Sequence, residues 1–132
     1  MDGTLLGQQR NNDLICYDYD VDFGVSSVEY EILYKILREN TPEKYIVEET
    51  NILGIKSLKI IHKKSNLNCD INPYNRNSIS WGKALWDYLM NSYRPVDPRL
   101  IFPLRQVDFL GQKVFIPNKP DRVLTQLYGS SY

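Results

Sequence analysis

Polar and apolar residues alternate strictly along residues 17–25, YDYDVDFGV, and this period of two predicts a β-strand. One face of the predicted strand carries Tyr17, Tyr19, Val21 and Phe23, and the other carries Asp18, Asp20 and Asp22. We expect the aromatic side chains of Tyr17 and Phe23 to pack in the core. The preceding segment, residues 2–10, is predicted to form a turn at Gly3 and Thr4 that leads into a short helix.

A helix and three strands are predicted after the acidic strand. Ser26 or Ser27 can cap a helix that runs to about Asn40, because apolar residues recur there three and four positions apart. Its buried stripe is expected to contain Val28, Ile32, Leu33, Ile36 and Leu37. Strands are predicted at residues 44–49, 57–63 and 66–73, and the last of these carries Asp70 and is expected to end at Pro73.

The C-terminal half predicts a helix, a hairpin and a second helix. Residues 80–90 have helical spacing, with Trp81, Leu85 and Leu89 on one packed face, and residues 102–117 read as two strands around Leu110, Gly111 and Gln112. The last helix is expected to have Asn118 as N-cap, Pro120 in its first turn and Gly129 at its end. This mixed order predicts an α+β fold, a mixed sheet with helices packed on it, in one domain over residues 1–132.

Composition excludes several classes of protein. The 132 residues carry 16 basic and 16 acidic side chains, so the balanced charge gives no reason to expect a nucleic-acid or anionic-membrane binder. Cys16 and Cys69 are too few for a four-cysteine zinc site, and are expected to be free thiols or, in an oxidising compartment, one bridge. His62 is expected at the surface end of a strand, so catalysis would rest on carboxylates, hydroxyls, Lys or Arg.

Two familiar acidic motifs are disfavoured. Asp2-Gly3-Thr4-Leu5 resembles the nucleophile loop of a phosphatase, but the position of the attacking aspartate falls before Met1. Asp18, Asp20, Asp22 and Glu29 have the spacing of EF-hand ligands, yet Phe23 stands where the loop needs glycine. A merely solvated acidic strand face stays open, although three like charges on one face repel one another.

The alternating acids favour a metal site. Carboxylates two residues apart on a strand point the same way, with Cα atoms roughly 6.5–7 Å apart, and can share Mg²⁺ or Mn²⁺. A third carboxylate from a neighbouring strand would complete the site, and Asp70 is the natural candidate beside Asp20 and Asp22. Such a site suits phosphoryl transfer, in which the protein mainly positions groups and neutralises charge.

Four segments, in order, resemble the LicD/fukutin-related family of the nucleotidyltransferase superfamily. They are Gly3-Thr4-Leu5-Leu6-Gly7 with Arg10, Tyr17-Asp18-Tyr19-Asp20-Val21-Asp22, Cys69-Asp70-Ile71-Asn72-Pro73, and the C-terminal Phe109-Leu110-Gly111, Ile116-Pro117 and Tyr128-Gly129. Family members often have Trp at the position of Tyr17, Pro at that of Cys16 and an aromatic residue at that of Asn72. They also normally have a helix before Gly3, so an N-terminal helix is expected to be missing.

The resemblance implies an enzyme that moves phosphocholine or ribitol phosphate from a CDP-activated donor to a glycan hydroxyl. Asp20, Asp22 and Asp70 would then be catalytic and bind Mg²⁺ or Mn²⁺, with Asp18 as a third ligand or a support; Asp70 could instead help to deprotonate the acceptor. Gly3, Thr4 and Arg10 would contact the donor phosphates, although Gly3 can equally be a plain helix-entry turn and Arg10 a solvated helix end.

Other readings stay open. The chain could be a non-catalytic nucleotide- or glycan-binding remnant, or it could transfer a nucleotide to another acceptor. Without an apolar run of membrane-spanning length or a basic leader, a cytoplasmic location is expected, with the Golgi lumen as the alternative for a fragment.

Overall fold

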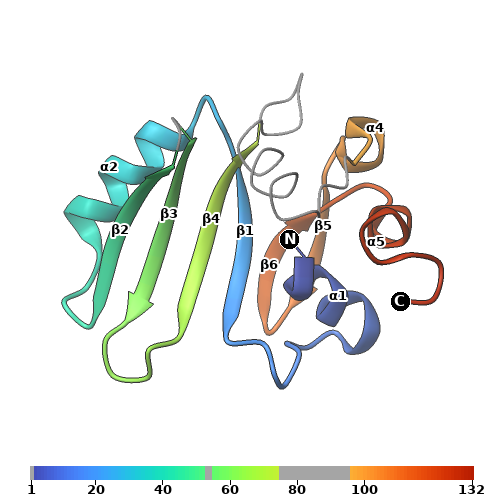
Figure 1. Ribbon diagram of the computed structural model, residues 1–132, viewed down its shortest axis with the longest axis horizontal. Coiled ribbons are helices and arrows are strands. Elements are labelled where there is room, and N and C mark those ends of the chain that lie inside the picture. Colours follow the sequence, from blue (N-terminus) through green and yellow to red (C-terminus); the bar gives the residue numbers. More distant parts are fainter. Residues whose placement is uncertain (1, 53–54, 75–95) are drawn as a thin grey trace.

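The computed structural model describes residues 2–52, 55–74 and 96–132 (Figure 1). Within these ranges the larger sheet has four strands in the order β1-β4-β3-β2. The strands are β1 (Asp20–Ser26), β2 (Tyr45–Ile52), β3 (Ile55–His62) and β4 (Asn68–Tyr74). β1 runs parallel to β4, whereas the β3–β4 and β2–β3 pairs are antiparallel. The predicted α+β class with a mixed sheet is therefore confirmed.

The acidic strand is shorter than its alternation predicted. β1 begins at Asp20, so Asp18 precedes the strand, and Tyr17 lies in a turn. Tyr17 is 85% exposed and Phe23 46% exposed, so the prediction that both pack in the core is wrong. The turn at Tyr17 breaks the alternation before the ladder with β4 begins at Asp20 and Asn68.

Pro73 does not end β4, contrary to the prediction. The strand continues to Tyr74, and Pro73 pairs with Val25 of β1. The β3–β4 ladder reaches only to Ile71 in this direction. Proline lacks an N–H, and beyond Ile71 the ladder with β3 no longer needs one, so the strand tolerates it.

The helix α2 (Tyr30–Asn40) covers one face of the sheet, along β2 and β3 in Figure 1. Its N-cap is Glu29 rather than Ser26 or Ser27, because Ser26 is still part of β1. The predicted buried stripe is half wrong, since Leu33 and Leu37 pack inward while three members are exposed. The exposed members are Val28 at 84%, Ile32 at 63% and Ile36 at 51%. Tyr30 takes the inward position and packs with Leu58 and Ile71.

A second group of elements lies beyond the β1 edge of the sheet (Figure 1). It comprises α1 (Asp2–Asn11), α4 (Pro98–Ile101), the β5 (Arg105–Phe109) and β6 (Gln112–Ile116) hairpin, and α5 (Pro120–Tyr128). Its core joins Leu5 and Leu6 of α1 to the fully buried Val123 and Leu124 of α5. Burial of these side chains holds α1 against α5, at roughly 1.5–3 kcal/mol for each large apolar group.

The C-terminal predictions hold with small shifts. The hairpin is confirmed, and its loop consists of Leu110 and Gly111, both at positive φ (51° and 75°), because Gln112 already pairs with Phe109. The last helix is confirmed with Gly129 at its end, at φ 93°, but its N-cap is Lys119 and not Asn118.

The predicted helix at residues 80–90, with Trp81, Leu85 and Leu89, lies outside the described residues. In the described part of the chain, none of the helices has the length and hydropathy that a bilayer span requires.

Candidate active site

The parallel pairing of β1 and β4 brings the predicted acids together. Asp22 stands directly opposite Asp70, and Asp20 stands opposite Asn68. Directly paired residues on neighbouring strands project from the same face of a sheet, with the strands about 4.8 Å apart. Asp20, Asp22 and Asp70 therefore share one face, as the sequence predicted for Asp20 and Asp22.

This acidic face is the one that α2 does not cover. Ile71 and Cys69, which alternate with Asp70 along β4, pack against Tyr30 and the other inward residues of α2. Since successive residues of a strand point to opposite faces, Asp70 and Asp22 lie on the other side of the sheet. Asp70 keeps 26% of its side chain exposed, so a ligand can reach it.

Asp18 contributes to the acidic group from outside the strand. Its carboxylate lies against α1, where a Cβ placed on Gly3 would stand 2.0 Å from Asp18 Oδ2. Burial raises the pKa of Asp18, and a side-chain hydrogen bond with Asp20 and the charges of Asp20 and Asp22 raise it further. The missing side chain of Gly3 thus makes room for a carboxylate that is crowded by the other acids.

Gly3 and Thr4 do not form the predicted turn, because α1 already begins at Asp2 and both residues are helical. The hydroxyl of Thr4 accepts a hydrogen bond from the backbone N–H of Asp22, at 3.0 Å. β1 is the edge strand of its sheet, so its outer N–H groups need partners from elsewhere. The first turn of α1 is therefore fixed beside the acids.

Arg10 lies in the last turn of α1, about 1.7 turns along the helix from Thr4. Burial, followed by a hydrogen bond to Asp121, raises the pKa of the Tyr132 hydroxyl, and the charge of Arg10 opposes that rise. The guanidinium thus acts electrostatically on the C-terminal tyrosine, and none of the described contacts joins it to the acids.

Two residues of the acidic face were missed from the sequence. Lys59 of β3 pairs with Asp70 in the ladder, and its Nζ lies 3.3 Å from Asp70 Oδ1. Asn68 stands beside Asp20, and its buried Oδ1 has no hydrogen-bond partner among the described residues. Asn68 and Asp70 are two residues apart, as Asp20 and Asp22 are, so the sequence could have indicated that Asn68 shares a face with Asp70. The contact of Lys59 with Asp70 could not be predicted without the register between β3 and β4.

The oxygen donors fit a hard divalent cation. Carboxylates at Asp20, Asp22 and Asp70, with the unpartnered amide oxygen of Asn68, are the ligand types that Mg²⁺ and Mn²⁺ take. Among the described residues, no three His, Cys, Asp or Glu side chains are already gathered closely enough to hold a metal. The arrangement suits an ion held by one or two carboxylates together with substrate phosphates.

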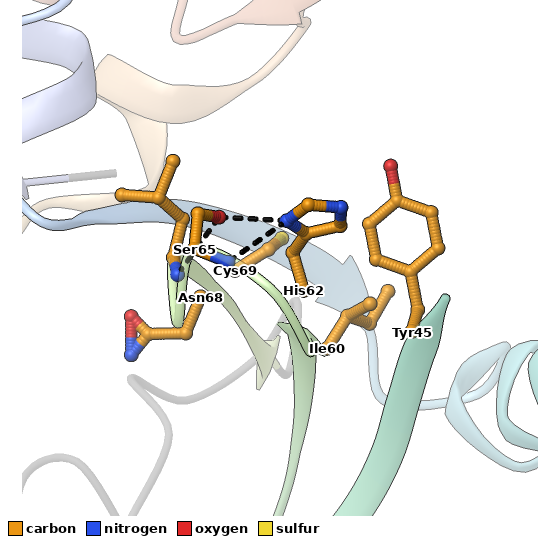
Figure 2. Close-up of a pocket in the computed structure, with 7 residues that line it drawn as sticks. Tyr45, Ile60, His62, Ser65, Asn68 and Cys69 are labelled. Atoms are coloured by element: carbon orange, nitrogen blue, oxygen red, sulfur yellow. Dashed lines mark hydrogen bonds between the residues drawn. The ribbon is translucent and has the colours of Figure 1, made fainter. Parts of the chain in front are cut away.

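His62 lies away from this face, at the end of β3, as predicted. It lines a hollow of about 400 Å³ together with Tyr45, Ile60 and Cys69 (Figure 2). The Ser65 backbone N–H lies 3.3 Å from His62 Nδ1 and donates to it, and the Ser65 hydroxyl lies 2.7 Å from the same atom. These bonds give His62 a role in the β3–β4 turn.

Cys16 and Cys69 are free thiols, so no bridge joins them. Burial raises the pKa of Cys69 to about 11, and the negative charges of Asp70 and Asp22 add to the effect. A raised pKa leaves little of the nucleophilic thiolate at neutral pH, which disfavours Cys69 as the group that would attack a substrate.

Comparison with known protein families gives a match that covers most of the chain. The family model for the LicD/FKTN/FKRP nucleotidyltransferase domain matches residues 1–119. No curated protein and no solved structure gives a significant match to the chain. The family match covers α1, the acidic strand β1, and Asp70 on β4, as well as the hairpin. The chain therefore belongs to the LicD/fukutin-related family.

Proposed function

We propose that this chain is a metal-dependent phosphotransferase. It would move a phospho-alcohol, of the phosphocholine or ribitol phosphate type, from a CDP-activated donor to a hydroxyl of a glycan. Membership of the LicD family suggests a transferase. The observation that carries the proposal is the parallel register that sets Asp22 opposite Asp70, with Asp20 on the same face, opposite α2.

The acids and α1 have separate roles in this proposal. Asp20, Asp22 and Asp70 would hold Mg²⁺ or Mn²⁺, and Asp18 would support Asp20 through their hydrogen bond. The ion, when bound, supplies positive charge to the phosphoryl oxygens. Gly3 and Thr4, in the first turn of α1, would face the donor phosphates, where a helix offers unpaired N–H groups.

The reaction is an in-line displacement at the phosphorus that carries the alcohol. The acceptor oxygen forms a bond to this phosphorus, the bond to the bridging oxygen of the diphosphate breaks, and CMP leaves with that oxygen. The proton of the acceptor hydroxyl passes to a base. Asp70 is a candidate for this base in the alternative in which Asp20 and Asp22 alone hold the ion, because its side chain is partly exposed on the same face.

Two measurements test the proposal on the same chain. Thermal shifts with CDP-choline, CDP-ribitol, CDP-glycerol, CTP and ATP, each with and without Mg²⁺ or Mn²⁺, identify the donor class. Release of CMP in the presence of a glycan acceptor then reports turnover. We expect a metal-dependent shift with a CDP-linked alcohol, and CMP release that Asp20→Asn abolishes.

The matched control is Asp108→Asn, which removes one carboxylate on the β5–β6 hairpin, where Asp108 pairs with Lys113. This variant should keep both signals. Metal-dependent binding without CMP release would favour the non-catalytic binding module. A response to CTP or ATP but not to CDP-linked alcohols would favour nucleotide transfer to another acceptor.

A further inference from the structure

A row of charged residues crosses the face of the sheet opposite α2. Asp22 on β1 pairs with Asp70 on β4, Asp70 pairs with Lys59 on β3, and Lys59 pairs with Glu48 on β2. Paired positions point to the same face, so all four side chains start from one line across the strands. Lys59 is thus the basic residue in a row that is otherwise acidic.

The ammonium group of Lys59 is directed toward the candidate site. Lys59 has two cross-strand neighbours, Glu48 and Asp70. Among the described contacts, its ammonium pairs with Asp70, with Lys59 Nζ 3.3 Å from Asp70 Oδ1. The side chain of Lys59 is 36% exposed and that of Asp70 26%. The pair is therefore neither sealed in the core nor fully solvated, and another ion can replace either partner.

The negative charge at the candidate site requires a positively charged side chain in addition to the metal ion. The carboxylates and a diphosphate donor together carry more negative charge than one divalent cation cancels. Arg10, the basic residue of the sequence motif, lies in the last turn of α1 and makes none of the described contacts with the acids. The contact of Lys59 with Asp70 instead places a cation beside the acids. A lysine has a flexible four-carbon stem, so its ammonium can move by several ångströms without any backbone change.

We propose that Lys59 exchanges partners during donor binding. It pairs with Asp70 when the donor is absent, and it binds a phosphate oxygen of the donor when the metal takes Asp70. This inference rests on the proposed function, since it assumes a metal and a phosphorylated donor on the same face. It assigns Lys59 two measurable effects of opposite sign, competition with the metal and support of the donor.

Lys59→Met removes the charge and keeps the length of the side chain. Without nucleotide, Mn²⁺ should bind the variant about threefold more tightly than the wild type, because a competing cation beside Asp70 is gone. With Mg²⁺ present, CDP should bind about tenfold more weakly, because a charge-assisted hydrogen bond to phosphate is lost. Isothermal titration calorimetry measures both constants.

Two further variants make the test specific. Lys56→Met removes the same charge from the same strand, but Lys56 pairs with Glu31 of α2, at 2.7 Å on the covered face. It should leave both affinities unchanged. Lys59→Arg keeps the charge and should bind CDP within about threefold of the wild type. A thermal melt of each variant confirms that it folds.

Different results would overturn the role of Lys59 and the proposed function. If wild type binds Mn²⁺ and CDP while Lys59→Met matches it in both titrations, Lys59 has no such role and the proposed function stands. If Lys59→Met and Lys56→Met change CDP binding equally, the effect is one of net charge and the inference is again overturned. If wild type binds neither ligand, both proposals are overturned.

Discussion

Thr4 and Asp22 are joined by a hydrogen bond, in which the backbone N–H of Asp22 donates to the Thr4 hydroxyl at 3.0 Å. This bond ties the first turn of α1 to the edge strand that carries the acids. α1 is in turn held by the contact of Leu5 and Leu6 with the core of α5. The position of the acidic strand therefore depends on residues at both ends of the chain.

Replacing Thr4 tests this connection. Thr4→Val keeps the branched shape but removes the acceptor, so we expect the free energy of unfolding to fall by about 1–2 kcal/mol. Thr4→Ser keeps the hydroxyl and should retain most of that stability. Urea unfolding of the two variants measures the difference. Equal stability of the Val and Ser variants would show that the bond to Asp22 contributes nothing.

Gly3 and Asp18 should behave as a coupled pair. Alanine at Gly3 favours the helix by up to about 1 kcal/mol, but its Cβ would meet Asp18 Oδ2 at 2.0 Å. We therefore expect Gly3→Ala to stabilise the chain only when Asp18→Ala is also present. A double-mutant cycle in urea measures this coupling. Additive effects of the two substitutions would mean that Asp18 does not occupy the space at Gly3.

Gly7 should tolerate alanine less well than Gly3. A Cβ there would stand 2.4 Å from the backbone oxygen of Asp13, which cannot turn away as a side chain can. Gly7→Ala should lower the free energy of unfolding by about 1–3 kcal/mol, despite the better helix propensity of alanine. A melting temperature at or above that of the wild type would contradict the close packing of the loop after α1.

Sequence patterns predicted most of the helices and strands, and the wrong predictions have local causes. The alternation that predicted β1 located Asp20 and Asp22, but it extended too far, because Tyr17 lies in a turn before the ladder begins. The stripe of α2 was misplaced because an aromatic residue, Tyr30, takes the inward position, where its hydroxyl lies 3.4 Å from Glu49 Oε1.

In the candidate site, too, some residues were predicted from the sequence and others were not. Asp70 was predicted as the third acid of a metal site. The strand register places it opposite Asp22, and its role as a metal ligand stays a prediction. Lys59 could not be predicted, because its contact with Asp70 depends on the register between β3 and β4. β3 and β4 are consecutive strands, and their register is set by the conformation of the turn at residues 63–67, which the alternation of polar and apolar residues does not encode.

The two thiols should differ in reactivity. Cys16 is exposed, whereas burial and the neighbouring acids raise the pKa of Cys69 to about 11. A raised pKa leaves less thiolate, so at pH 8 about one Cys69 side chain in a thousand is a thiolate. Raising the pH by one unit should speed up its alkylation about tenfold until the pH approaches 11. Mass spectrometry after iodoacetamide treatment measures both sites. Rapid labelling of Cys69 in folded Cys16→Ser at pH 8 would contradict this environment.

We expect the acids on β1 and β4 to bind a divalent cation together with a donor phosphate. Calorimetric titration of CDP into the Mn²⁺-loaded chain tests it most directly, with Asp22→Asn compared against Asp108→Asn. Asp22→Asn should weaken CDP binding about tenfold or more, and Asp108→Asn should match the wild type. Equal CDP affinity in wild type and Asp22→Asn, both loaded with Mn²⁺, would contradict the account.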